Sequence, residues 1–179
     1  MDIIETGIDG LVVISPKIYR DGRGYFCETF SQKEFDEKIG KTVFVQDNES
    51  CSKYGVLRGL HYQKYPFAQA KLVRVASGRI LDVAVDLRKD SPTFGKHFSI
   101  ELSNENRFQI FIPRGFAHGF IVLSEMAICQ YKCDNFYEPD SAEGIKWDDE
   151  QLNIDWKLPH EDIILSEKDK VNQSFNEHI

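Results

Sequence analysis

Two histidines stand in segments whose residue types are suited to moving protons on a small molecule. His61 ends the segment Arg58-Gly59-Leu60-His61, and His118 lies within residues 112–120, a turn that leads into a strand. A histidine titrates near neutral pH and can act as a general base, and an arginine can hold an anion through two parallel hydrogen bonds. Taken alone, each segment also has a simple structural interpretation: an exposed strand end for Arg58 and His61, and a core histidine for His118.

Arg58 and His61 can serve one pocket only if the strand that carries them is irregular. Side chains alternate between the two faces of a regular strand, so residues three positions apart point in opposite directions. A glycine is where a β-bulge can correct this, and Gly59 lies between the two residues. We therefore predict a break in strand register at Gly59 if both side chains reach the same site.

A third segment, residues 130–133, is a strand-like run that contains Tyr131, and Tyr137 follows nearby. Taken alone, Tyr131 is more simply interpreted as an aromatic packing residue. Cys129 and Cys133 share strand parity there, which indicates that both pack inside. With Cys27 and Cys51 they form no CxxC pair, and we expect four free thiols in a reducing compartment.

Many short strands must position these segments. Val and Ile recur in short runs between turn signals, which predicts a mainly β fold of the sandwich or barrel type, with Ser77-Gly78 as one turn. In residues 97–102 the alternation puts Phe98, Ile100 and Leu102 on one buried face. The expected strands are residues 11–14, 25–30, 43–46, 71–76, 79–87, 97–102, 108–112, 119–123 and 127–133, besides the one with Arg58 and His61.

One short peripheral helix is expected after Ser31. Glu34 follows three positions later as in a capping box, Phe35 and Ile39 are four apart, and Gly40 suits the helix end. Residues 157–179 are more polar and are expected to fold back as a tail. The sequence shows no internal repeat and no linker that would divide the chain, so residues 1–179 are expected to form a single domain.

Composition and charge exclude several classes of function. Of 179 residues, 41% are hydrophobic, and 22 basic against 29 acidic residues give a formal net charge of −7. No cluster of Lys and Arg interleaved with aromatics suggests nucleic-acid binding. No apolar run approaches the ~20 residues that span a bilayer, and the first residues do not resemble a signal peptide. We expect a cytoplasmic protein that binds neither nucleic acid nor membranes.

The order and spacing of the three segments resemble the dTDP-4-dehydrorhamnose 3,5-epimerases of the cupin superfamily. The resemblance runs almost end to end and implies a cupin-type antiparallel β-barrel or jelly roll. It is carried by Arg23-Gly24 and residues 26–30, 46–48, 57–63, 71–75, 86–95, 113–120, 144–147 and 164–169.

The resemblance implies an epimerase that inverts carbons 3 and 5 of dTDP-4-keto-6-deoxy-D-glucose, a step of dTDP-L-rhamnose biosynthesis for cell-surface polysaccharide. The ketone at carbon 4 acidifies the neighbouring hydrogens, so that removing one gives an enolate. By resemblance, His61 is the base, Asp169 orients it, Tyr131 is the acid across the ring, and Lys71 stabilises the enolate oxygen. No cofactor and no metal are implied.

The resemblance also assigns residues to substrate binding, with Tyr137 stacking on the thymine and arginine holding the diphosphate. It implies a homodimer in which the N-terminal strand region of one subunit enters the site of the other. The assigned residues are Arg23, Glu28, Gln46, Asp47, Asn48, Arg58, Lys71, His118, Tyr137, Glu143 and Lys168.

Glu49 departs from the family pattern, because other members often carry histidine there. If its carboxylate approached His61, it would favour the charged imidazole and raise its pKa, which we state as a hypothesis. Cys27 and Cys51 also stand where other residues are common.

Three alternatives remain open at the level of sequence. Relatives of the family invert a single carbon or shift the ketone instead. Many cupins are metal-dependent enzymes with an HxH pair, but here Tyr62 and Gln63 follow His61. A non-catalytic sugar-binding cupin is the third alternative, which the presence of all four proposed catalytic residues argues against.

Overall fold

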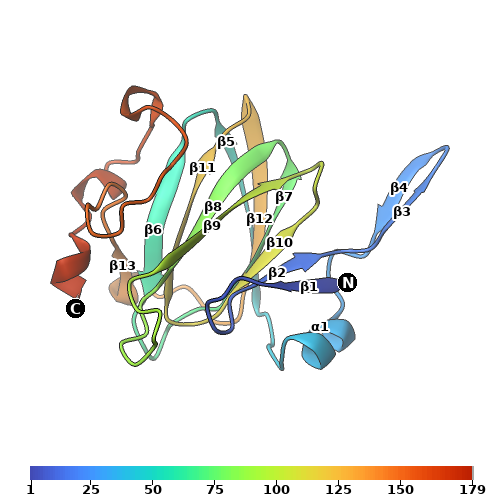
Figure 1. Ribbon diagram of the computed structural model, residues 1–179, viewed down its shortest axis with the longest axis horizontal. Coiled ribbons are helices and arrows are strands. Elements are labelled where there is room, and N and C mark those ends of the chain that lie inside the picture. The colour runs from blue at the N-terminus through green and yellow to red at the C-terminus, as the bar shows by residue number, and fades with distance from the viewer. Residues whose placement is uncertain (179) are drawn as a thin grey trace.

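Two antiparallel sheets face one another in the computed structural model, which describes residues 1–178 (Figure 1). The predicted mainly β fold of the cupin type is confirmed. The six-stranded sheet contains, in spatial order, β1 (Asp2–Glu5), β2 (Val12–Ser15), β10 (Gln109–Ile112), β7 (Lys71–Ser77), β12 (Met126–Cys133) and β5 (Gln46–Lys53).

The second sheet has five strands, and a separate hairpin projects from the body of the molecule (Figure 1). The five-stranded sheet runs β13 (Ala142–Gly144), β6 (Leu57–Gln63), β11 (Phe116–Val122), β8 (Arg79–Asp86) and β9 (His97–Ser103), and the hairpin comprises β3 (Ile18–Asp21) and β4 (Gly24–Cys27). The helices are short: α1 (Gln32–Lys38) and the 3₁₀ turns η1 (Pro139–Ser141), η2 (His160–Asp162), η3 (Asp169–Val171) and η4 (Phe175–His178).

Apolar side chains of both sheets meet in a shared core. Val73 and Ile110 of the larger sheet pack in one cluster with Ile80 and Phe120 of the smaller sheet, and all four are at most 5% exposed. As predicted, Phe98, Ile100 and Leu102 face this cluster. Removing such surface from water is the main favourable contribution to folding.

The C-terminal segment packs on the five-stranded sheet and lies beside β6 in Figure 1. Trp156 and Phe175 are at most 4% exposed and join Leu57, Leu81 and Val83 in a second apolar cluster. This packing anchors the chain on either side of η3, so that Asp169 is brought to strand β6.

Some local expectations were wrong. The strand predicted at residues 43–46 begins instead at Gln46 and continues to Lys53, because its polar side chains alternate along an edge strand. The strand predicted at 25–30 ends at Cys27. The capping box is not formed: the Ser31 hydroxyl caps no amide within residues 1–178, and Glu34 pairs at 3.1 Å with the N-terminal amine.

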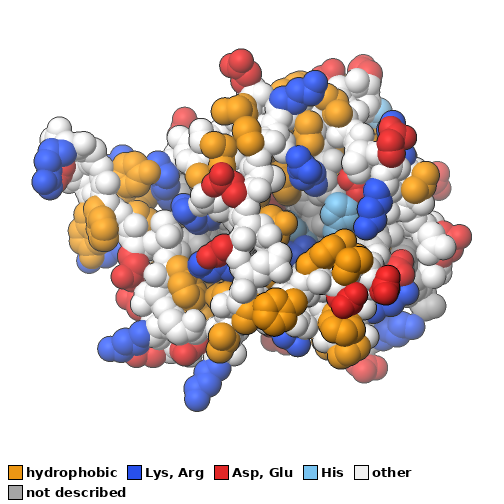
Figure 2. All heavy atoms as spheres, turned by 180° about the vertical axis from the view of Figure 1, so that it is seen from behind, with side chains coloured by type: hydrophobic (Ala, Val, Ile, Leu, Met, Phe, Trp, Pro, Cys, Tyr) orange, Lys and Arg blue, Asp and Glu red, His pale blue; other side chains and the backbone are white. Residues whose placement is uncertain are grey.

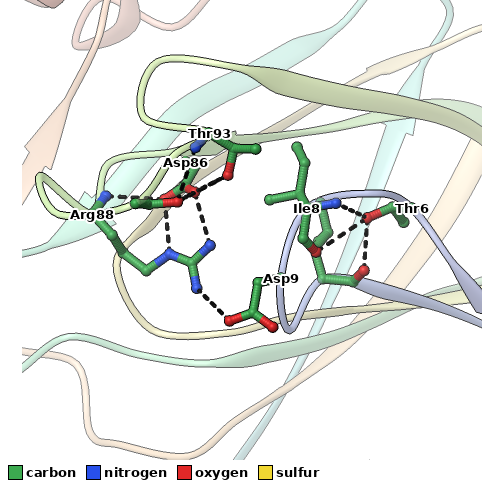
Figure 3. A network of polar contacts seen from close by, with 8 residues as sticks. Thr6, Ile8, Asp9, Asp86, Arg88 and Thr93 are labelled. Carbon is green, nitrogen blue, oxygen red and sulfur yellow. Dashed lines mark hydrogen bonds and ion pairs between the residues drawn. The ribbon is translucent and has the colours of Figure 1, made fainter.

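A buried carboxylate organises the loop after β8 (Figure 3). Asp86 is fully buried and accepts hydrogen bonds from Arg88 at 2.8 Å, from Ser91 at 2.6 Å and from Thr93 at 2.7 Å. Although burial alone would raise its pKa, these hydrogen bonds lower the pKa of Asp86 to about 2. Arg88 also lies 3.9 Å from Asp9, which links the loop to the N-terminal turn.

Candidate active site

A cavity of about 480 Å³ opens between the two sheets. Figure 2 shows the hollow from behind, with a histidine side chain visible in its wall. Its size is that of small-molecule sites in general. Strands β5, β7 and β12 form one wall, strands β6 and β11 form the other, and the C-terminal segment contributes Ser166, Lys168 and Asp169.

His61 reaches the cavity from β6 and is held by a buried carboxylate. Its Nε2 atom lies 2.5 Å from Oδ1 of Asp169, which is 3% exposed. The hydroxyl of Ser166 donates to the other Asp169 oxygen at 2.9 Å. Burial favours the protonated acid, but the hydrogen bonds from His61 and Ser166 keep the pKa of Asp169 below its ordinary value. An ionised Asp169 fixes the tautomer of His61 and stabilises its protonated form.

The predicted break in register occurs at Gly59. His61 pairs with His118 and Arg58 with Phe120, so that two residues of β6 lie opposite one residue of β11. Gly59 has a φ of +144°, and a Cβ there would lie 2.5 Å from the Cα of Gly119. Arg58 and His61 consequently both line the cavity.

Tyr131 and Lys71 face the cavity from the opposite sheet. Tyr131 lies on β12, and Lys71 begins the neighbouring strand β7, where it pairs with Cys133. Burial raises the pKa of the Tyr131 hydroxyl, which keeps it protonated at neutral pH. Burial also lowers the pKa of the Lys71 ammonium, an effect opposed by the nearby Cys133 and Asp82.

His118 forms a second histidine–carboxylate pair beside the first. Its Nε2 atom lies 2.8 Å from Oδ2 of Asp82, which is fully buried. Burial lowers the pKa of His118, an effect that Asp82 partly opposes, so the neutral imidazole is favoured. The role of Asp82 was not predicted, although an acidic residue inside the apolar run 80–87 was a signal for it.

Two buried polar groups were not predicted from the sequence. The Ser50 hydroxyl and the second Asp82 oxygen have no hydrogen-bond partner among residues 1–178. Ser50 also lines the cavity. Buried polar groups are normally paired, so Ser50 is a candidate for contact with a bound molecule. The two-residue spacing from Gln46 and Asn48 was a signal for this position, but residues 46–53 were not predicted to be a strand.

Most of the residues assigned by resemblance meet in this cavity. Arg58, whose Nε donates to Ser52 at 3.1 Å, and Lys168 bring positive charge to an otherwise acidic protein. The assigned residues in the lining are His61, Lys71, Tyr131, Asp169, Gln46, Asn48, Arg58, His118, Tyr137, Glu143 and Lys168.

Arg23, Glu28 and Asp47 lie outside the cavity lining of their own chain. Arg23 stands at the tip of the projecting hairpin, where its side chain is 92% exposed and pairs with Asp21 at 2.6 Å. Asp47 points to the other face of β5 and pairs with Lys132 at 2.8 Å.

The hypothesis that Glu49 approaches His61 was wrong. Glu49 is exposed on the same outer face of β5 as Asp47, and it accepts a hydrogen bond from Gln130 at 2.5 Å. Strand alternation explains the outcome, because Gln46, Asn48 and Ser50 occupy the inward positions.

Within residues 1–178 no group of three or more His, Cys, Asp or Glu side chains is placed to hold a metal ion. The same part of the chain has no helix long and apolar enough to cross a membrane.

Comparisons with known proteins agree on one family. The model of the dTDP-4-dehydrorhamnose 3,5-epimerase family matches residues 5–177. The dTDP-4-dehydrorhamnose 3,5-epimerase of Shigella flexneri is 52% identical over 98% of this chain and 96% of its own.

Solved structures of such enzymes superpose closely on the fold. The crystal structure of the dTDP-4-dehydrorhamnose 3,5-epimerase of Elizabethkingia anophelis has a TM-score of 0.95 and 53% identity, covering 99% of this chain and 97% of that one. The dTDP-6-deoxy-D-glucose-3,5-epimerase of Legionella pneumophila was solved in complex with dTDP-4-keto-L-rhamnose. It has a TM-score of 0.94 and 51% identity, covering 98% of this chain and 93% of that one.

Proposed function

This chain belongs to the dTDP-4-dehydrorhamnose 3,5-epimerase family, and we propose that it converts dTDP-4-keto-6-deoxy-D-glucose into dTDP-4-keto-L-rhamnose for dTDP-L-rhamnose biosynthesis. One observation carries the proposal: His61 and Tyr131 line the same cavity from opposing sheets. Inversion of a carbon centre requires a base on one face of the sugar ring and an acid on the other.

His61 removes the proton from the carbon next to the ketone. Its Nε2 atom is bonded to Asp169, so the Nδ1 lone pair is the one available to the substrate. The C–H electron pair forms a C=C bond to the carbonyl carbon, and the carbonyl π electrons move onto its oxygen to give the enolate. The imidazolium that forms lies against the ionised Asp169. Such a general base contributes roughly 10²–10⁴-fold to the rate.

The enolate oxygen requires positive charge or hydrogen-bond donors beside it. Lys71 and His118 both line the cavity, and neither belongs to the acid or the base. Fixed groups of this kind stabilise developing charge because they are oriented before the reaction begins. Lys71 supplies the charge, and the neutral His118 supplies a second polar contact.

Tyr131 returns a proton to the opposite face. Its raised pKa keeps the hydroxyl protonated until the enolate accepts the proton, after which the phenolate is reprotonated by solvent. His61 releases the proton that it removed to solvent, and the same pair of groups then acts on the second of carbons 3 and 5. All of these steps use side chains of the protein, without a cofactor.

The nucleotide occupies the open end of the cavity. Arg58 and Lys168 suit the diphosphate, because a guanidinium and an ammonium both donate to phosphate oxygens. Tyr137 is 56% exposed at the cavity wall and offers a ring for stacking on the thymine. The remaining polar residues, Gln46, Asn48 and Glu143, are proposed to contact the substrate between these points.

We propose that the enzyme is a cytoplasmic homodimer with shared sites. The hairpin of β3 and β4 projects from the body and exposes Tyr19 and Phe26, which supports a protein interface there. Arg23 and Glu28 would then complete the cavity of the partner subunit instead of their own. The four free cysteines fit a reducing compartment.

Incubation with dTDP-4-keto-6-deoxyglucose in heavy water tests the function. We expect deuterium at both carbons 3 and 5, measured by mass spectrometry and proton NMR. Label at one carbon would indicate a 3-epimerase or another narrower relative, and absence of label at both carbons would refute the epimerase.

A further inference from the structure

We propose that Gln63 is a positioning residue that sets the nucleotide-binding geometry by holding the backbone on both sides of Tyr137. The inference rests on the proposed stacking role of Tyr137 and adds a residue to which no role was assigned. Gln63 is the last residue of β6, two positions after His61 on the same strand.

The Gln63 side chain bonds to two loops at once. Its Nε2 donates to the carbonyl oxygen of Phe136 at 3.1 Å and to that of Phe67 at 2.6 Å. Its Oε1 accepts from the backbone N–H of Glu138 at 2.8 Å. The bonds to residues 136 and 138 therefore flank Tyr137 directly, and Gln63 itself is only 7% exposed.

Tyr137 depends on this support for its position. Residues 134–138 form no helix or strand, and the Tyr137 side chain has no hydrogen bond to any residue of the described chain. The position of its ring is consequently set by the backbone that carries it, together with the side-chain rotamer. An unsupported loop would spread the ring over many orientations, and a bound base would have to restrict them at an entropic cost.

Other contacts hold the start of the same loop but stop short of Tyr137. Gln69 donates to the carbonyl oxygen of Asn135 at 2.8 Å, and Asn135 donates to that of Pro66 at 3.3 Å. Only the Gln63 amide, among the side chains of residues 1–178, bonds to the backbone of both neighbours of Tyr137.

The placement of Gln63 links base recognition to catalysis. Residues two apart on a strand are separated by roughly 7 Å and point to the same side. The strand that places the proposed base His61 therefore also fixes the element that carries Tyr137. Gln63 acts through the tyrosine, so it should influence nucleotide affinity more than proton transfer.

The test substitutes Gln63→Glu, which keeps the shape and one acceptor but turns the two donated bonds into repulsion against carbonyl oxygens. We expect the Kd for dTDP and the KM for the sugar nucleotide to rise about 10-fold, with kcat within about twofold. Gln151→Glu, an exposed site outside the cavity, controls for the change in net charge, and the double substitution below controls for a carboxylate inside the cavity. A fall in kcat at unchanged KM, or an unchanged dTDP Kd, would overturn the proposal.

A double substitution separates positioning from general disruption. In a Tyr137→Ala background, Gln63→Glu should change the dTDP Kd by less than about twofold, because the ring that it positions is gone. An equal loss of affinity in both backgrounds would refute the action through Tyr137. Because dTDP binding needs no turnover, these results stand apart from the heavy-water test of the epimerase.

A measurement on the unmodified protein covers the case in which Gln63→Glu fails to fold. The backbone amide of Glu138 is bonded to Gln63, so its hydrogen exchange should be slowed at least 10-fold relative to an unstructured chain. Exchange of that amide at the unstructured rate would contradict the proposed clamp.

Discussion

The Nε2 atom of His61 lies 2.5 Å from Oδ1 of Asp169, although the two residues are 108 positions apart in the chain. Packing of Trp156 and Phe175 on the five-stranded sheet positions the intervening C-terminal segment. The pair therefore depends on the fold of the whole C-terminal region and not on a local motif.

Substitutions of His61 and of Asp169 should both slow proton removal, but to different extents. We expect His61→Asn to lower kcat at least ~10³-fold, and Asp169→Asn to lower it roughly 10²-fold, because the imidazole remains but loses its charged partner. Deuterium incorporation from heavy water measures this step directly. Asp155→Asn, an exposed change outside the cavity, should leave the rate unchanged. Full activity of Asp169→Asn would contradict the role of the pair.

Tyr131→Phe should separate proton exchange from inversion. His61 can still remove a proton and return a deuteron to the same face, so substrate of unchanged configuration should gain label while product formation falls roughly 10²-fold or more. Proton NMR of the recovered sugar nucleotide distinguishes labelled substrate of unchanged configuration from inverted product. Normal inversion by this variant would exclude Tyr131 as the acid.

The β class could be predicted from the sequence because apolar alternation is a local property, and the break at Gly59 could be predicted because strand geometry demands it. Strand β5 was misplaced, since its polar residues, Gln46 to Lys53, give no apolar period. The inward position of Ser50 follows from strand alternation only once residues 46–53 are known to be a strand. The pairing of Asp82 with His118 depends on which strands become neighbours, which is a tertiary property. The role of Asp169 came only from family resemblance.

Asp86→Asn should destabilise the fold in a pH-dependent manner. The folded pKa of about 2 is below the ordinary 3.8, so the ionised group stabilises the native state above about pH 4, and this contribution is lost as pH falls towards 2. The difference corresponds to about 2 kcal/mol at neutral pH.

Urea unfolding of the Asp86→Asn variant at pH 7 and at pH 3 measures this contribution. The gap in free energy of unfolding between wild type and variant should narrow at the lower pH. Asp140→Asn, an exposed change, serves as the control. A gap that stays constant between the two pH values would refute the assignment to an ionised Asp86.

Glu49→Gln should leave the pH–rate profile unchanged. Glu49 is exposed and bonded to Gln130 on the outer face of β5, so its charge is separated from His61 by the strand and screened by solvent. Rates measured between pH 5 and pH 9 should superpose on those of the unmodified enzyme. A displaced acidic limb would show that Glu49 acts on the base after all.

Mixing of two inactive variants tests whether subunits exchange their hairpins. Arg23→Ala removes a group proposed to act in the partner's site, and His61→Asn removes the base of the chain's own site. A mixed dimer then contains one site with both lesions and one site with neither. Co-refolding at equal amounts should restore about a quarter of the unmodified activity, since half of the dimers are mixed and each has one intact site.

The control mixes His61→Asn with Tyr131→Phe. Both residues line the cavity of their own chain, so every site in a mixed dimer keeps one lesion and no activity should return. Restoration in the first mixture but not in the second therefore requires that Arg23 serve the other subunit. If the first mixture shows only the average of its two components, Arg23 acts within its own chain or not at all, and the shared-site proposal fails even though the epimerase assignment stands.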